Sequence, residues 1–296
     1  MINLEEVKII TICENTASDL EFIGEWGLSI LVNTGDMKVL FDTGGGLSVL
    51  PNADHFNIQF SDIDVIVLSH GHVDHTGGLV SVLKRMHYEK PDKKIDIIAH
   101  PSIFDNKYYQ RSQSENPFYE GVPFKINEIE QWGGNFILSE GPVILNDDIV
   151  TSGEIEMTNA FESVSPCCLV KKNNRYIIDN LCDDLALYLT TEMGLIVIAG
   201  CSHRGIINSL YHARKITGNN NIFMAMGGTH LVNVSEEQLK FTVREIQQLN
   251  VKKVGASHCT GMDSASYLAS ELGGVFFHNN AGSVVEFSGG ILNCKS

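Results

Sequence analysis

The most informative part of this sequence is residues 65–78, which read VIVLSHGHVDHTGG. The segment begins with four apolar residues that do not alternate with polar ones, a pattern typical of a central strand covered on both faces. Apolar residues then have helical spacing over 79–86, and 95–99 is a further apolar run. A strand, a loop, a helix and a second strand in this order indicate α/β architecture.

Similar patterns occur on both sides of this segment. Apolar runs predict strands at residues 7–13, 28–33, 39–41, 176–178, 187–189, 195–199, 221–226 and 251–256. Helices are predicted over 206–213 and from Ser235, which forms a capping box with Gln238, to about 249. Residues 101–160 contain four prolines and many polar residues, so we expect an irregular insertion there that shapes a substrate pocket. We predict that residues 1–296 form a single domain around this insertion.

The composition argues against several classes of function. The chain has 296 residues, with 36 acidic against 21 basic side chains, and its formal net charge is −15. We expect no binding to nucleic acid or to an anionic membrane surface from so acidic a chain, and no apolar run is long enough to span a membrane. The seven cysteines are scattered without a CxxC pair, and the N-terminus lacks a signal-peptide pattern, which together predict a cytoplasmic protein. A monomer and a homo-oligomer are both compatible with the sequence.

Six of the 11 histidines directly follow predicted buried strands. They are His70, His72, His75, His203, His230 and His258. Because sites in α/β proteins lie at the carboxyl ends of strands, we expect these side chains to gather there. His70 and His72 are two residues apart on a loop and can reach one ion, whereas Asp74 and His75 can face a second ion beside it. Imidazole and carboxylate are common ligands of zinc, iron and manganese, so this pattern predicts a metal site.

The segment His70-Gly71-His72-Val73-Asp74-His75 resembles the HxHxDH motif of the metallo-β-lactamase superfamily, and Asp42 resembles its earlier aspartate. Further segments resemble a subgroup similar to dihydropterin ribofuranosylaminobenzene-phosphate synthase. They are Gly27-Leu28-Ser29, Phe41-Asp42-Thr43-Gly44, Gly200-Cys201-Ser202-His203, Gly227-Gly228-Thr229-His230-Leu231 and His258-Cys259-Thr260-Gly261. The resemblance covers nearly the whole chain and implies an αββα sandwich of two mixed β-sheets flanked by helices, with a two-metal site at one sheet edge.

The resemblance also implies how the ligands are shared between two divalent metal ions. One ion would be held by His70, His72 and His203, and the other by Asp74, His75 and His258. Zinc is the expected metal, with iron or manganese as alternatives. Asp42 is expected to orient a ligand histidine or its loop.

Several positions remain open at this stage. The bridging carboxylate of the superfamily has two candidate replacements, Cys201 and Glu154, although Cys201 also fits a small buried thiol. His230 is a ligand, a proton donor or a pocket-lining group, and His100 is a candidate pocket residue. Asp183 and Asp184 either cap a turn or contact the ligands.

Two positions depart from the subgroup pattern. Trp26 stands where a histidine commonly precedes Gly-Leu-Ser, and Thr229 stands where an aromatic residue is usual. Both are expected to line or back the pocket, so they weaken the transfer of a particular substrate to this chain but leave the metal ligands intact.

Four functions are compatible with these features. The leading prediction is a metal-dependent hydrolase, in which a hydroxide activated by two metal ions attacks a small ester or phosphate-containing substrate. Asp74 and His230 are its predicted catalytic residues, and His230 and Arg204 its predicted substrate-binding residues. One alternative is a synthase that joins a phosphoribosyl donor to an aromatic acid and binds pyrophosphate through Arg204 or Arg111. The others are an iron-dependent redox protein and a metabolite-binding protein.

Overall fold

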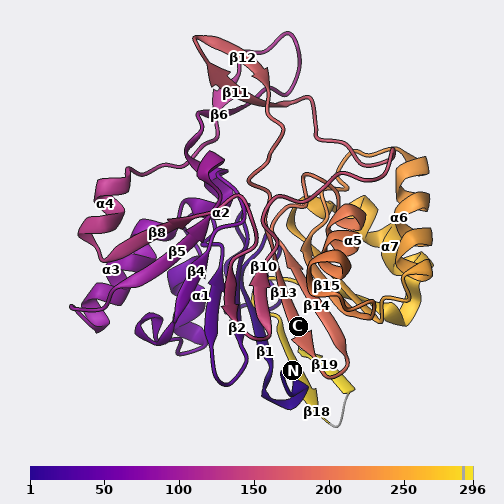
Figure 1. Ribbon diagram of the computed structural model, residues 1–296, viewed down its shortest axis with the longest axis horizontal. Helices are drawn as coiled ribbons and strands as arrows, with labels where there is room; N and C mark the ends of the chain where they lie inside the picture. The colour runs from indigo at the N-terminus through magenta and orange to yellow at the C-terminus, as the bar shows by residue number, and fades with distance from the viewer. Residues whose placement is uncertain (289–290, 296) are drawn as a thin grey trace.

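The computed structural model of the chain describes residues 1–288 and 291–295. Two β-sheets pack face to face, and helices cover the outer face of each sheet (Figure 1). The αββα sandwich predicted from the sequence is therefore confirmed.

The first sheet has eight strands within the described residues, in the order β19-β18-β1-β2-β3-β4-β5-β8. Their bounds are β1 Lys8–Cys13, β2 Ser29–Asn33, β3 Lys38–Phe41, β4 Val65–Val67, β5 Ile95–Ala99, β8 Gly134–Leu138, β18 Val284–Ser288 and β19 Ile291–Lys295. β1, β2 and β3 are antiparallel to one another in turn, whereas β3, β4 and β5 are parallel. The first sheet is therefore mixed, as expected.

The second sheet has seven strands in the same described part of the chain, in the order β17-β16-β15-β14-β13-β10-β9. Their bounds are β9 Ile144–Asn146, β10 Ile149–Thr151, β13 Ala186–Thr191, β14 Gly194–Ala199, β15 Ile222–Gly228, β16 Lys253–Ser257 and β17 Phe276–His278. β14, β15, β16 and β17 are parallel, and β13 is antiparallel to β14.

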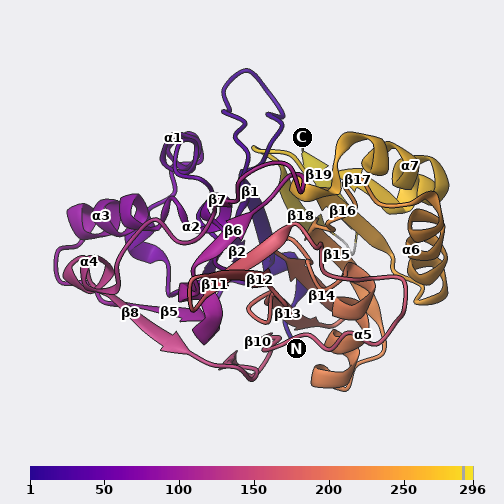
Figure 2. The ribbon, with the colours of Figure 1, turned by 90° about the horizontal axis from the view of Figure 1, so that it is seen from above.

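Helices of the first half lie beside the first sheet, and those of the second half lie beside the second sheet (Figures 1 and 2). The α-helices are α1 Val49–His55, α2 Val73–Thr76, α3 Leu79–Glu89, α4 Ile126–Gln131, α5 Ile206–Thr217, α6 Glu236–Gln248 and α7 Met262–Leu272. Short 3-10 helices are Leu4–Glu6, Phe60–Asp62, Pro101–Phe104, His258–Thr260 and Gly273–Val275. α6 begins as predicted, because the Ser235 side chain accepts a hydrogen bond from the backbone N–H of Gln238 at 3.2 Å.

The core explains why the central strands are apolar without alternation. In β14, Ile196 and Ile198 pack into the cluster between the two sheets, whereas Leu195 and Val197 pack into the cluster under α5, α6 and α7. A third cluster fills the space between the first sheet and α1, α3 and α4. A strand between two apolar layers must bury both of its faces, so polar residues are excluded from every position.

The same topology brings the histidine-bearing loops to one edge of the sandwich. β4 of the first sheet and β14, β15 and β16 of the second sheet are each followed by a loop or short helix that carries predicted site residues. Because each of these strands lies in a parallel group, each group presents its loops at the carboxyl ends of its strands. The site therefore lies where the two sheets meet.

A small third sheet projects beyond this edge. It consists of β12 Arg175–Ile178, β11 Cys168–Lys172, β6 Lys107–Tyr109 and β7 Phe118–Tyr119, and we call it the cap sheet. Figure 1 shows it above the body, and Figure 2 shows it over the junction of the two halves. Asn173 and Asn174 join β11 to β12 with φ of +50° and +60°, as a tight hairpin turn of type I′ requires. The segment 101–160 supplies strands to the cap sheet and to both large sheets.

None of the helices among the described residues combines the length and the apolar character that a membrane crossing requires.

Candidate metal centre

His70, His72 and His203, which we call the first triad, come from two different sheets. His70 and His72 follow β4, whereas His203 follows β14. His70 Nε2 lies 3.0 Å from His72 Nδ1 and 3.1 Å from His203 Nε2. All three side chains are buried, and their ligand atoms lie within 4.8 Å of one another.

Asp74, His75 and His258, which we call the second triad, lie beside the first. His258 Nε2 is 3.2 Å from both His75 Nε2 and Asp74 Oδ2, and His75 Nε2 is 3.9 Å from Asp74 Oδ2. Asp74 and His75 are carried by α2, and His258 follows β16. The structure thus brings all six predicted ligands into two adjacent groups.

The spacing and chemistry of these donors fit divalent metal ions. Ligands at 2.0–2.1 Å from a tetrahedral zinc are separated by roughly 3.3 Å, close to the 3.0–3.2 Å between the nitrogens here. Asp74 Oδ1 is buried and has no hydrogen-bond partner among the described residues, which is costly unless another group satisfies this oxygen. Nitrogen and carboxylate donors suit zinc, iron and manganese alike.

The two triads differ in protonation. Burial lowers the pKa of His72 to about 3, and burial with neighbouring histidines holds the pKa of His70 and of His203 well below the ordinary value. Burial would also lower the pKa of His75, but Asp42 and Asp74 raise it to about 9. The first triad therefore offers neutral nitrogens at neutral pH, whereas His75 of the second triad carries a proton in the metal-free protein.

Asp42 supports the second triad directly. Its Oδ2 lies 2.6 Å from His75 Nδ1, so His75 donates from Nδ1 and directs Nε2 toward the other ligands. Asp42 also accepts hydrogen bonds from the backbone N–H and the hydroxyl of Ser69, both at 2.7 Å. This is the orienting role expected from the sequence. Asp42 has a φ of +59°, a backbone conformation that is unfavourable for a residue other than glycine.

Glu14 and Asn15 play a similar part for His258, and neither is predicted from the sequence. Asn15 Oδ1 lies 2.9 Å from His258 Nδ1, and Glu14 Oε1 accepts the backbone N–H of His258 at 2.6 Å. Both residues directly follow the buried strand β1. Their position after a strand, which drew attention to the histidines, is the signal that would have found them.

Cys201, and not Glu154, lies between the two triads. Cys201 Sγ is 3.1 Å from His75 Nε2, and it is grouped within 4.8 Å of ligand atoms of His70 and His75. The side chain of Glu154 is 41% exposed and lies 3.3 Å from His100 Nε2 and 3.6 Å from Arg204 Nη1. Of the two candidate bridging residues, only Cys201 is therefore close to a member of each triad.

His230 lies at the side of the first triad. Its ring centroid is 4.2 Å from that of His203, and its backbone N–H donates to Cys259 Sγ at 3.3 Å. Burial would lower the pKa of His230, but Cys259, Asp184 and Asp74 raise it. Nδ1 of His230 is buried without a hydrogen-bond partner among the described residues, so this nitrogen is available to another group.

Trp26 lies beside the second triad. Its ring centroid is 5.2 Å from that of His258, and the residue is 60% exposed. Thr229, the other departure from the subgroup pattern, is buried and bonds through its hydroxyl to that of Thr260 at 2.9 Å. Trp26 therefore lines the outside of the centre, whereas Thr229 backs it.

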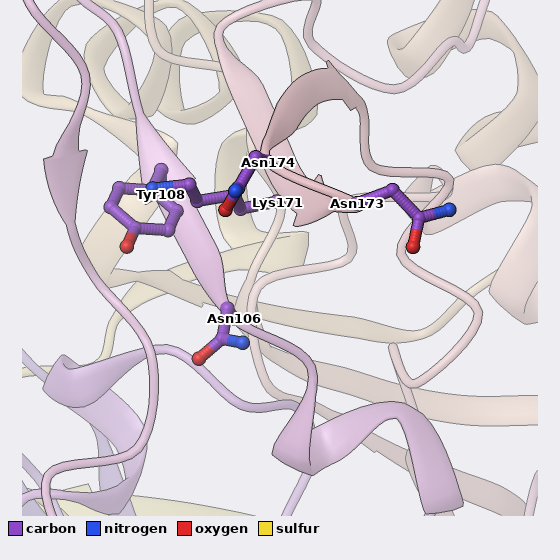
Figure 3. Close-up of a pocket in the computed structure, with 5 residues that line it drawn as sticks. All are labelled: Asn106, Tyr108, Lys171, Asn173 and Asn174. Atoms are coloured by element: carbon purple, nitrogen blue, oxygen red, sulfur yellow. The ribbon is translucent and has the colours of Figure 1, made fainter.

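A separate hollow of about 470 Å³ lies on the cap sheet. Figure 3 shows its lining residues, which are Asn106, Tyr108, Lys171, Asn173 and Asn174. None of them belongs to either triad, and none is a histidine, cysteine or carboxylate. The predicted ligands therefore lie in the histidine cluster and not in this hollow.

The αββα fold and the two triads define the class of this protein. The chain belongs to the metallo-beta-lactamase superfamily, whose family model matches residues 27–146. It is 34% identical over 293 residues to 7,8-dihydropterin-6-methyl-4-(beta-D-ribofuranosyl)-aminobenzene-5'-phosphate synthase of Methanocaldococcus jannaschii, a match that covers 96% of this chain and 98% of that relative. An uncharacterized protein of the same organism is 30% identical, over 92% of this chain and 97% of its own length. The resemblance to the synthase subgroup is thereby confirmed.

Solved structures agree on the fold. A metal-dependent hydrolase of the beta-lactamase superfamily matches with a TM-score of 0.78 and 27% identity, over 95% of this chain and 99% of that chain. A metallo-beta-lactamase fold protein of Bacillus subtilis matches with a TM-score of 0.57 and 12% identity, over 95% and 99% of the two chains. The second match supports the fold alone.

The leading prediction of a hydrolase is wrong. The curated relative with 34% identity over nearly its whole length is named as a synthase, whereas the structural relative titled a hydrolase is 27% identical. The physical reason is that the HxHxDH motif specifies a metal site, and one metal site can serve different reactions on the same fold. The comparisons favour the synthase alternative. Because this relative is an enzyme, they also support the prediction that the chain is an enzyme.

Proposed function

We propose that this protein is a synthase that makes a small molecule containing a ribofuranosyl aminobenzene 5'-phosphate. The observation that carries the proposal is the 34% identity to the named synthase over 96% of this chain. The name of that relative describes a product with two linkages, one between ribose and the benzene ring and one between the amine and the 6-methyl carbon of a dihydropterin. Transfer of a phosphoribosyl group from its diphosphate to the carboxyl-bearing ring carbon of an aromatic acid would form the first linkage, with pyrophosphate leaving the ribose and CO2 leaving the ring.

We propose that the two triads hold the metal ions of this enzyme, one ion each, with zinc as the expected metal and iron or manganese as alternatives. Support comes from the 3.0–3.2 Å spacing of the nitrogens and from the unpartnered Oδ1 of Asp74. Divalent ions bound there would stabilise negative charge on phosphate oxygens or on a leaving group. Cys201 lies between the triads and is the candidate to contact both ions.

His230 and Arg204 are the proposed substrate-binding groups of the chain. Cys259, Asp184 and Asp74 raise the pKa of His230 against the effect of burial, so its imidazole is suited to donate a hydrogen bond or a proton to a phosphate or leaving group. Arg204 contacts Glu154 at 3.6 Å, and its Nε is buried without a partner among the described residues. An arginine with an unused donor suits a phosphate oxygen, and Glu154 is exposed enough to move away.

Product analysis tests this proposal in two arms. The zinc-loaded protein is incubated with phosphoribosyl diphosphate and an aromatic acid in one arm. In the other it is incubated with ribofuranosyl aminobenzene 5'-phosphate and a dihydropterin activated at its 6-methyl carbon. Mass spectrometry should detect the joined product in one arm, and that arm identifies the bond that is formed.

His72→Ala should abolish product formation, whereas His55→Ala, which removes an exposed histidine outside both triads, should not. Absence of a joined product in both arms would contradict the proposal. Equal product from wild-type protein and His72→Ala would contradict the part assigned to the first triad.

A further inference from the structure

Two adjacent carboxylates, Asp183 and Asp184, lie next to the metal centre without belonging to either triad. Both are buried, with 0% and 1% exposure. They lie two and three residues before Ala186, the first residue of β13, which pairs with Ala199 at the end of β14. This register places the two carboxylates beside the loop that follows β14 and carries His203.

Asp183 bonds to the loop of the HxHxDH motif. Its Oδ2 accepts the backbone N–H of Gly71, the residue between the first two histidines of the motif, at 2.8 Å. Its Oδ1 accepts a hydrogen bond from the buried Lys107 Nζ at 2.9 Å. A Cβ at Gly71 would come within 2.4 Å of the backbone oxygen of Ile103. The loop therefore packs closely against this backbone on one side and bonds to Asp183, and only a glycine fits at position 71.

The next two residues extend these contacts to both loops. Asp184 Oδ2 accepts the backbone N–H of Arg204, directly after His203, at 2.9 Å. The backbone N–H of Leu185 donates to the backbone oxygen of Ser69, directly before His70, at 2.8 Å. Three consecutive residues, 183–185, therefore bind the loop of the first sheet and the loop of the second sheet.

This arrangement matters because the first triad draws its ligands from both sheets. Nothing in the covalent chain fixes His203 relative to His70, and their Nε2 atoms must stay near 3.1 Å to share an ion. We propose that Asp183 and Asp184 are positioning residues that hold the two loops in register for the ion of the first triad. Among the described residues, neither carboxylate hydrogen-bonds to the second triad, which instead depends on Asp42 and Asn15.

The inference rests on the two-ion centre of the proposed function, and metal stoichiometry tests it without any synthase assay. Wild-type protein, Asp184→Ala and Asp184→Asn are titrated with Zn²⁺ against a chromogenic chelator. We expect wild type to bind two equivalents. Asp184→Ala should bind the ion of the second triad as tightly as wild type does. It should bind the ion of the first triad about 10–100-fold more weakly, which is the usual effect of removing a group that orients a metal ligand. Asp184→Asn keeps an oxygen for the Arg204 N–H and should restore the weakened equivalent.

Two further variants distinguish a positioning role of Asp184 from a general loss of folded structure. Asp105→Ala removes a carboxylate that pairs with Lys172 at 3.2 Å and should leave both equivalents unchanged. Should Asp184→Ala fail to fold, Asp184→Ser replaces it, because a serine hydroxyl is polar but too short to reach the Arg204 N–H.

Two unchanged equivalents in the alanine or serine variant, or equal weakening of both, would overturn the positioning role alone. Wild-type protein that binds no zinc would overturn the proposed metal centre, and the positioning role with it.

Discussion

The two triads of the proposed metal centre place their candidate ligands by different means. The first triad joins loops from two sheets, and its nitrogens are neutral because burial lowers the pKa of each histidine. The second triad takes two ligands from one helix, α2, and its His75 is bonded through Nδ1 to a buried carboxylate. The first triad is therefore sensitive to the relative position of the sheets, and the second is sensitive to charge and pH.

The largest expected loss of synthase activity follows from removing a single predicted ligand of either triad. His72→Ala should lose the first ion and His258→Ala the second, and synthase activity should fall by about 10³-fold or more in each variant, since a metal ion contributes several kcal/mol to a transition state. Steady-state kinetics and metal analysis check both variants. If either variant kept both ions, the division of ligands between the triads would be wrong.

Loss of the Asp42 carboxylate should affect mainly the second triad. Asp42→Asn keeps an oxygen for Ser69 but removes the charge that faces His75 Nδ1 at 2.6 Å. We expect the second zinc equivalent to bind about 10–100-fold more weakly, with a smaller effect on the first. Chelator competition measures both affinities. A selective loss of the ion of the first triad would contradict the assignment of Asp42 to the second triad.

The pH dependence of metal binding should separate the triads further. His75 has a pKa of about 9 in the metal-free protein, so a metal ion must displace its proton below that pH. The affinity of the second triad should therefore fall about tenfold for each pH unit below this pKa, whereas the neutral first triad should change little between about pH 6 and 8.

Calorimetry of the single-triad variants in buffers of different ionisation enthalpy counts the released protons. His72→Ala, which keeps the second triad, should release about one proton more per ion near pH 7 than His258→Ala. Equal proton release from the two variants would contradict the difference in protonation.

The smallest expected effect concerns Trp26, which lies beside the second triad only. The chain has two tryptophans, and the other, Trp132, contacts His87 away from both triads. In a Trp132→Phe background, zinc binding to the second triad should change the emission of Trp26, and binding to the first should change it much less. Trp26→Leu should alter folding stability by no more than about 0.5 kcal/mol, because the side chain is largely exposed. An emission change that persists in His258→Ala would contradict this placement.

The candidate ligands and the support from Asp42 could be predicted from the sequence, but the supports from Asn15, Glu14 and Asp183 could not, and the reason is distance along the chain. His70 to His75 form one motif, and the other ligand histidines follow apolar strands, so local patterns are enough to find them. Asn15 is 243 residues from its partner His258, and Lys107 is 76 residues from Asp183. Such pairs arise from the topology of the sheets: a position after a strand marks Asn15 as a candidate, but no local spacing identifies its partner. The type of reaction also could not be predicted from the motif, because the HxHxDH pattern is compatible with both hydrolase and synthase chemistry.

We propose that two metal ions bind, one in each triad. Anomalous scattering from a zinc-loaded crystal, recorded on both sides of the zinc absorption edge, tests it most directly. We expect two peaks, one among the nitrogens of His70, His72 and His203 and the other among Asp74, His75 and His258. A single peak, or a peak among Cys201, His230 and Cys259, whose ligand atoms also lie within 4.8 Å of one another, would contradict it.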